Sequence, residues 1–311
     1  MINTNELHLN FDENRLPPGQ IPIVTNSMEL FQLFIDMIMR SKQQNGYSTM
    51  GVVTGLSGVG KTIAIQTFLN SLQDRPHNGL PAGIEIKVTP GSTPRALMEK
   101  LLMRFGEKPR GNNTNRYKIA DEAAEAIMNN DLKILFVDEA DLLNVDGFEF
   151  LRYIFNKTGC PIVVVGLRQI LRVIREYEKF GSRVGPHIEF RPPDEDEVLT
   201  KILPQLLVPH WKYDLSSEAD IAMGMELWDR TKPSFRNLRT VLQYASMLTE
   251  LYEKEWISRD ILKQSWQMMA SKKYPDELLE EEESVEESQT EYEKESERRQ
   301  DDKANKNQDS I

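Results

Sequence analysis

Cysteine is almost absent from this sequence of 311 residues, which contains only Cys160. One cysteine excludes a disulfide framework and most metal sites, and it is typical of proteins in a reducing compartment. The 4 histidines show no spacing that metal ligands adopt. No apolar run approaches the length that spans a membrane, and no cationic segment followed by an apolar one opens the sequence. We therefore expect a cytoplasmic protein with no membrane partner.

Positive charge is scarce towards the end of the chain, and this shortage accounts for most of the net charge of −11. Residues 274–311 contain 15 Asp and Glu against 5 Lys and Arg, whereas the other 273 residues contain 34 against 33. After Leu279 almost no apolar residue is present, so we expect a disordered acidic tail. The simplest role of such a tail is solubility. An alternative role is an acidic mimic of DNA that limits non-specific binding.

Apolar segments alternate with helical patterns up to Phe190. The predicted strands cover residues 49–54, 83–89, 134–138, 161–165 and 187–190. Most have little polar interruption, which is typical of parallel strands that are buried on both faces. The predicted helices, the first of them capped by Asn26-Ser27, cover residues 28–43, 62–72, 92–105, 117–130, 148–156 and 170–180.

From Pro193 onward the strands stop, and helical patterns follow over residues 194–207, 217–230, 234–251 and 258–272. We therefore predict an α/β fold with a parallel sheet sandwiched by helices, followed by a small all-helical lid domain. The predicted domains are an extended N-terminal arm, the α/β domain, the lid and the acidic tail, over residues 1–26, 27–192, 193–273 and 274–311.

A glycine-rich motif lies between the first predicted strand and the next helix. The segment Gly55-Leu-Ser-Gly-Val-Gly-Lys-Thr62 fits G-x-x-x-x-G-K-[ST], the Walker A loop, whose backbone N–H groups cradle phosphates. In this motif Lys61 reaches the β- and γ-phosphates, and the Thr62 hydroxyl ligates Mg²⁺. We predict ATP and Mg²⁺ as cofactors, contacted by Gly55, Ser57, Gly58, Val59, Gly60, Lys61, Thr62 and Ile63.

A second motif ends the apolar strand Ile134-Leu-Phe-Val-Asp138 with the carboxylates Asp138 and Glu139. In a Walker B motif of this kind Asp138 holds Mg²⁺. Glu139 is placed to polarise an attacking water, a role that P-loop kinases do not need from that position. A chance glycine-rich turn and a buried strand end are the alternative explanation. The two motifs in this order and context favour an NTPase.

At this point the sequence resembles the AAA+ ATPases, and more narrowly the target-selecting ATPases of DNA transposons, the TnsC/TniB type, with MuB as a distant relation. The resemblance covers roughly residues 28–272. Besides the Walker A loop it rests on four segments in family order: Asp138-Glu-Ala-Asp141, Val163-Val-Val-Gly166, Glu178-Lys-Phe-Gly-Ser-Arg-Val184 and Pro233-Ser-Phe-Arg-Asn-Leu-Arg239. It implies ATP hydrolysis, homo-oligomeric rings or helical filaments on double-stranded DNA, and as partners a transposase and a target-selecting protein.

The resemblance also implies roles for three arginines. Arg183 resembles the arginine finger that reaches the γ-phosphate of a neighbouring subunit, since a guanidinium stays charged and matches phosphate geometry. The alternative is an ordinary surface arginine. Arg236 or Arg239 resembles the lid residue that senses nucleotide within the same subunit. Pro233 replaces the glycine often found before that arginine, so the choice between the two stays open.

A second position also departs from the family pattern. Members often have Thr or Asn after the equivalent of Gly166 to hold the lytic water, whereas this chain has Leu167. Arg168 or Gln169 could substitute for it. Without a substitute we expect slow hydrolysis, which would suit a timing switch.

The predicted DNA contacts are basic residues around a loop rich in Gly and Asn: Arg104, Lys108, Arg110, Arg116 and Lys118. Such contacts would position the protein on phosphates without reading sequence, because nothing resembles a recognition helix or a zinc finger. An ordinary solvated loop is the alternative. A second basic strip, with Arg168, Arg172 and Arg175, lies near the expected subunit interface.

Three other function classes stay open. A helicase loader of the DnaC or IstB type usually has an N-terminal partner-binding domain, and residues 1–26 are too short and polar to form one. A P-loop kinase or phosphotransferase is disfavoured by Glu139 and the lid arginines. A signalling or defence ATPase is normally fused to an effector domain, for which this sequence has no candidate.

Overall fold

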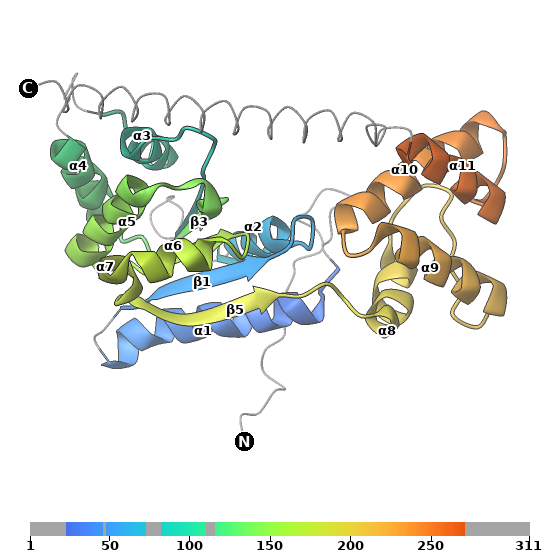
Figure 1. Ribbon diagram of the computed structural model, residues 1–311, viewed down its shortest axis with the longest axis horizontal. Helices are drawn as coiled ribbons and strands as arrows, with labels where there is room; N and C mark the ends of the chain where they lie inside the picture. The colour runs from blue at the N-terminus through green and yellow to red at the C-terminus, as the bar shows by residue number, and fades with distance from the viewer. Residues whose placement is uncertain (1–22, 46–47, 73–81, 110–115, 271–311) are drawn as a thin grey trace, which may run out of the picture.

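The computed structural model describes residues 23–45, 48–72, 82–109 and 116–270. Its centre is a sheet of five parallel strands in the order β2-β3-β4-β1-β5 (Figure 1). The strands are β1 (Met50–Gly55), β2 (Gly83–Lys87), β3 (Ile134–Asp138), β4 (Ile162–Gly166) and β5 (Val184–Phe190). The predicted α/β fold with a parallel sheet is therefore confirmed.

Helices cover both faces of the sheet because successive residues of the buried strands point to opposite sides. On one face, Phe136 and Val163 pack with α1 (Asn26–Asn45) and α2 (Lys61–Leu72). On the other face, Val137 and Val164 pack with the remaining helices of this part. These helices are α3 (Pro94–Arg104), α4 (Arg116–Asn129), α5 (Val145–Thr158), α6 (Ile170–Glu176) and α7 (Glu178–Gly181).

The chain beyond Pro193 is helical and has a core of its own, in which Trp211, Leu227 and Leu238 are buried. Its elements are α8 (Glu195–Glu197), the π-helical turn η3 (Val198–Ile202), the 3-10 turn η4 (Leu203–Gln205), α9 (Glu218–Thr231), α10 (Phe235–Leu251) and α11 (Arg259–Ala270). In Figure 1 this lid lies beside the sheet, at the end where β5 runs into α8.

Two predicted helices are interrupted in the structure. The helix expected over 170–180 breaks at Tyr177, which leaves helical geometry and donates its hydroxyl to Glu149 on α5. The helix expected over 194–207 is divided into α8, η3 and η4, and Pro204 is the second residue of the last of these turns. Proline lacks an N–H for the helical ladder, so it favours such a division.

The start of α1 also differs from the prediction. Thr25, rather than Asn26-Ser27, caps the helix, because its hydroxyl oxygen accepts the Met28 N–H at 3.3 Å. The Asn26 N–H instead donates to Glu197 Oε1 at 2.6 Å, which connects α1 with the start of the lid. The structure also includes a short 3-10 turn, η2 (Ala140–Leu142), directly after β3. In the described ranges no helix combines the length and apolarity needed to cross a bilayer.

Candidate nucleotide-binding site

The glycine-rich loop connects the end of β1 to the start of α2. Gly58 and Gly60 have φ values of 78° and 102°, in the left-handed region that favours glycine. The Lys61 ammonium folds back over the loop and donates to the carbonyl oxygens of Gly55 at 2.8 Å and Leu56 at 2.7 Å. A positive side chain and the N-terminus of a helix therefore face the same space, as an anion requires.

The charge of Lys61 is only partly compensated in this structure. Burial lowers the pKa of its ammonium below the usual range, and the charge of Arg236 lowers it further, while Asp138 and Asp141 act in the opposite direction. A bound phosphate would supply the additional negative charge that favours the protonated amine.

Asp138 and Thr62 form the candidate magnesium position. The Thr62 hydroxyl donates to Asp138 Oδ2 at 2.7 Å, and the other carboxylate oxygen of the buried Asp138 accepts the Glu139 N–H at 2.9 Å. A hydroxyl and a carboxylate are ligands that Mg²⁺ takes together with phosphate oxygens and water. Among the described residues, no group of three or more His, Cys, Asp or Glu could hold a metal ion by itself. The donors present therefore fit a magnesium ion that is shared with a nucleotide.

Glu139 follows directly after β3 and has a left-handed backbone, with φ of 55°. Its carboxylate forms an ion pair with Lys87 Nζ at 2.9 Å, and this hydrogen bond raises the pKa of Lys87. Lys87 ends β2 and pairs in register with Asp138, so the two strands deliver the cation and the carboxylate to the same edge. The candidate catalytic base is therefore held by a neighbouring strand.

Lys87 is not among the residues that the sequence predicts for the site. The alternation Gly83-Ile-Glu-Ile-Lys87 places its side chain on the face of β2 that is less buried. Only the adjacency of β2 and β3 brings it to Glu139, and adjacency is a property of the sheet order rather than of either segment.

The lid touches the glycine-rich loop directly. Ser234 caps α10, and the following Phe235 N–H donates to the Gly58 carbonyl at 3.0 Å. A Cβ added to Gly58 would collide with the Ser234 hydroxyl, so this contact also requires glycine. Arg236 and Arg239, on the first turns of α10, consequently face the loop.

A cavity of about 560 Å³ brings most of the predicted residues together. The predicted residues that line it are Ser57, Gly58, Gly60, Lys61, Thr62, Ile63, Asp138, Glu139, Arg236 and Arg239. The lining also includes residues that the sequence did not assign to the nucleotide: Lys87, Asp141, Leu142, Gly166, Leu167 and Phe235. Both lid arginines reach the cavity, so the structure leaves both as candidates.

A second, more apolar cavity of about 300 Å³ is lined by residues of the loop and the lid, with Gly60, Ile63, Phe235 and Arg239 common to both cavities. Its walls come from four separate parts of the chain and include Ile23, Met28, Val59, Ile202, Leu206 and Leu238. An apolar cavity beside a phosphate-binding loop suits the base of a nucleotide. Of the residues that line this cavity, the sequence predicts Val59, Gly60, Ile63 and Arg239 as nucleotide contacts, and the others meet only through the tertiary fold.

Arg183 lines neither of these two cavities. Its carbonyl accepts the Met50 N–H at 3.1 Å, at the start of β1, whereas the glycine-rich loop follows the other end of that strand. Its guanidinium donates from Nε to Asn156 Oδ1 at 2.8 Å and from Nη1 to the Lys179 carbonyl at 2.8 Å. The structure therefore does not bring Arg183 to the nucleotide site of its own chain.

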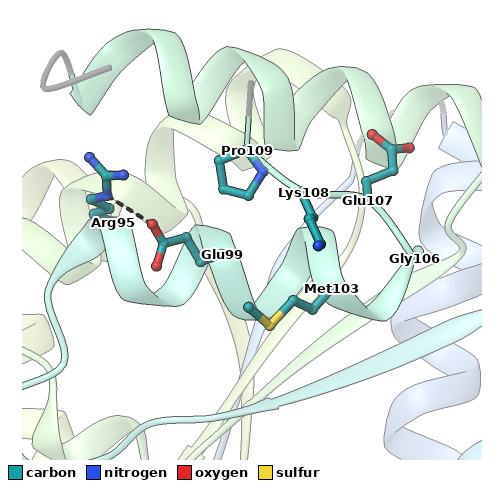
Figure 2. A pocket seen from close by; sticks show the side chains of 7 residues that line it. All are labelled: Arg95, Glu99, Met103, Gly106, Glu107, Lys108 and Pro109. Atoms are coloured by element: carbon teal, nitrogen blue, oxygen red, sulfur yellow. Dashed lines mark hydrogen bonds and ion pairs between the residues drawn. The ribbon is translucent and has the colours of Figure 1, made fainter. Parts of the chain in front are cut away.

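The predicted DNA contacts are only partly described. Lys108 lines a wide groove of about 920 Å³ between α3 and the segment that follows it, shown in Figure 2. The groove has both signs of charge, because Arg95 pairs with Glu99 at 2.8 Å and Glu107 lies next to Lys108. Of the other predicted contacts, Arg104 and Lys118 are exposed, Arg110 lies outside the described residues, and of Arg116 only the backbone at the start of α4 is described.

Two of the three arginines of the second basic strip form ion pairs. Arg168 pairs with Glu189 on β5, and Arg172 pairs with Glu176 one turn along its own helix at 3.0 Å. These ion pairs reduce the net positive charge that the strip would offer to phosphates.

Comparisons with known proteins agree with this geometry. Residues 44–174 match a family model described as an AAA domain. The Cdc6p structure of Pyrobaculum aerophilum is similar, with a TM-score of 0.63 and 16% identity over 80% of this chain and 69% of that chain. The ORC1 protein of Aeropyrum pernix, solved in complex with DNA, has a TM-score of 0.63 and 16% identity, over 81% and 68% of the two chains. The ORC2 protein of the same organism, in ADPNP-ADP complexes, has a TM-score of 0.65 and 14% identity, over 87% and 73%.

No curated protein matches the sequence. At 14–16% identity, the likeness to solved structures shows the fold alone. Together with the parallel sheet, the glycine-rich loop and the helical region, these findings show that the chain has the P-loop AAA+ fold, within which residues 44–174 match the AAA domain model.

Proposed function

We propose that this protein is an ATP-dependent AAA+ ATPase that binds double-stranded DNA without sequence preference and oligomerises on it. At a target site it recruits or regulates a transposase, together with a target-selecting protein. The single observation that carries the ATPase part is the cavity shared by Lys61, Thr62, Asp138 and Glu139. The DNA and transposase parts are supported by basic residues and by the motifs of the sequence.

The residues of the cavity suggest how hydrolysis would proceed. Magnesium, when bound, would neutralise phosphate charge, and Thr62 and Asp138 would hold it. Lys61 would exchange its two carbonyl partners for phosphate oxygens, because charged hydrogen bonds are stronger than those to neutral carbonyls. Glu139 would leave Lys87 and accept a proton from the attacking water. The bond between the γ-phosphorus and its bridging oxygen then breaks, which yields ADP and phosphate.

The proposed assembly is supported by the position of Arg183. Since it lies away from its own cavity, it could complete only the site of a neighbouring subunit. To do so its guanidinium would release Asn156 and the Lys179 carbonyl, so ATP in the adjacent subunit would compete with these local bonds. We infer that ATP favours rings or helical filaments in which each site is completed in trans.

DNA binding is supported by the exposed residues Arg104, Lys108 and Lys118, which lie on the α3 and α4 side of the molecule, away from the lid. A small number of phosphate contacts on each subunit is sufficient when an oligomer repeats them along a duplex. The similar ORC1 protein of Aeropyrum pernix was solved in complex with DNA. That likeness concerns the fold, and the transposase assignment depends on the sequence motifs.

The test of the DNA part is a mobility-shift titration of the full chain with labelled duplex. It is run with a non-hydrolysable ATP analogue and with ADP, at low and moderate salt. We expect binding only with the ATP analogue, little dependence on DNA sequence, and strong weakening by salt, because counterions are released from phosphates. No retained duplex under either salt condition would contradict DNA binding and would leave an AAA+ ATPase with another client.

A matched pair of double variants sharpens this test. Lys108→Ala with Lys118→Ala should lower affinity about equally for all sequences, with a salt slope about one unit shallower per lost phosphate contact. Lys254→Ala with Lys263→Ala removes the same charge from exposed positions in the lid and should leave the slope unchanged. Equal effects of the two pairs would contradict the assigned face.

A further inference from the structure

The strand β4 ends at the nucleotide cavity, but neither its last residue nor the residue that follows it has a polar side chain. Gly166 and Leu167 both line the cavity, and neither side chain can form a hydrogen bond. The next residue, Arg168, is 68% exposed and pairs with Glu189 on β5. The sequence offers Arg168 and Gln169 as substitutes for a polar residue at 167. Because Arg168 is engaged in its ion pair with Glu189, Gln169 is the remaining candidate.

Asp141 holds this strand end with both oxygens of its carboxylate. Oδ1 accepts the Leu167 N–H at 2.9 Å, and Oδ2 accepts the Gln169 side-chain amide at 3.3 Å. A Cβ added to Gly166 would collide with Asp141 Oδ1 and would lie 3.0 Å from the Asp141 nitrogen. The two segments can approach this closely only with glycine at 166.

Asp141 also faces the phosphate-binding residues. It lines the same cavity as Thr62 and Glu139, and its negative charge acts on the Lys61 ammonium. Gln169 therefore hydrogen-bonds a carboxylate that belongs to the nucleotide site. A carboxamide has two N–H donors and one acceptor oxygen, so after bonding Asp141 it can still bond a water or a phosphate oxygen.

We propose that Asp141 and Gln169 together replace the polar side chain that Leu167 cannot supply. Asp141 is a positioning residue that fixes the end of β4 against the end of β3. The Gln169 carboxamide, held by Asp141, bonds the γ-phosphate or the water that attacks it. The proposal rests on the proposed ATPase function. In that reaction water adds to the γ-phosphorus, the bond between the γ-phosphorus and ADP breaks, and the water proton passes to Glu139. It also gives the chain a means of distinguishing ATP from ADP.

The test compares neighbouring positions of the same turn in the full chain with Mg²⁺. Gln169→Ala changes an exposed residue, so its fold should be intact. We expect kcat to fall about tenfold with KM nearly unchanged, and the preference for ATP over ADP in direct binding to fall about threefold, because one hydrogen bond to the γ-phosphate side is lost. Arg168→Ala is the control and should change neither quantity by more than about twofold.

Rescue and coupling variants separate a functional role from a structural one. Leu167→Asn, added to Gln169→Ala, should restore most of the lost turnover, because it returns a carboxamide to the strand end. Asp141→Ala should lower kcat about as much as Gln169→Ala, and the double variant should be no worse than the more impaired single variant, because the two residues act as a unit.

Parental values of both kcat and the ATP-to-ADP preference in Gln169→Ala would overturn the proposal. An equal loss in Arg168→Ala would also overturn it, because it would show general loosening of the loop. Failure of the proposed function has a different signature, since Glu139→Gln would then hydrolyse ATP like the parent. In that case the binding preference measured on Gln169→Ala still decides the role of Gln169.

Discussion

In the α/β part of the molecule, the groups of the nucleotide cavity lie where strands end and where α2 begins, whereas the lid contributes the first turns of α10. The sheet fixes Asp138 and Lys87 side by side through its register. The lid contacts the loop through one backbone hydrogen bond, from Phe235 to Gly58. From this difference we propose that the sheet carries the chemistry of the site, and that the lid responds to its occupant through the glycine-rich loop.

The largest effect should come from the sheet side. Lys61→Ala should weaken ATP binding at least about a hundredfold, because it removes the point charge that pairs with the β- and γ-phosphates. Nucleotide titration followed by fluorescence or calorimetry measures it. The pH dependence has a definite sign: since burial lowers the pKa of Lys61, ATP affinity should begin to fall at a pH below the ordinary lysine value of 10.5. Unchanged affinity in Lys61→Ala would exclude this cavity as the phosphate site.

The lid arginines should have an intermediate effect. Arg236→Ala should lower turnover about tenfold to a hundredfold, because its charge already acts on Lys61 in the absence of nucleotide. Arg239 also lines the apolar cavity, so Arg239→Ala should mainly raise KM. Steady-state kinetics of both variants decides between them. A larger loss of kcat in Arg239→Ala would reverse the assignment.

The contact between lid and loop can be broken at one glycine. Gly58→Ala introduces a side chain at φ of 78° and pushes it against Ser234. We expect ATP affinity to fall about tenfold, because such strain costs on the order of 1–3 kcal/mol. Adding Ser234→Ala should recover part of the affinity by removing the hydroxyl, although the helix cap is lost. No recovery at all would show that backbone strain, and not the lid contact, causes the loss.

The ion pair of Glu139 should have the smallest effect. Lys87→Ala should raise basal ATP turnover about twofold to fivefold, since an exposed ion pair is worth at most about 1 kcal/mol and its loss frees the carboxylate. Lys133→Ala, which removes a partly exposed lysine directly before β3, is the control. Lower turnover in Lys87→Ala would show instead that the pair positions Glu139 for catalysis.

The sequence alone predicts the parts of the site that are contiguous. The glycine-rich loop with Lys61 and Thr62, and the strand that ends in Asp138-Glu139, each lie within one short segment, so pattern and spacing are sufficient to find them. The parallel sheet follows from uniformly apolar strands that alternate with helices. The same reasoning places a helical region after Pro193, and the structure has one there.

Other features depend on which segments become neighbours. Lys87 reaches Glu139 only because β2 lies next to β3, and Asp141 reaches Gln169 only because β4 lies on the other side of β3. The break at Tyr177 depends on a partner on α5, and no local pattern shows it. Local sequence periodicity carries no information about such long-range contacts.

The most direct test of the account is a comparison of Glu139→Gln with the parent protein, in which ATP binding and ATP hydrolysis are measured separately. The amide keeps the size of the side chain but cannot accept a proton from water as a base. We predict ATP affinity close to that of the parent and turnover lower by about 10²–10⁴. Hydrolysis at the parental rate would contradict the account, because the carboxylate at the end of β3 would then not perform the chemistry.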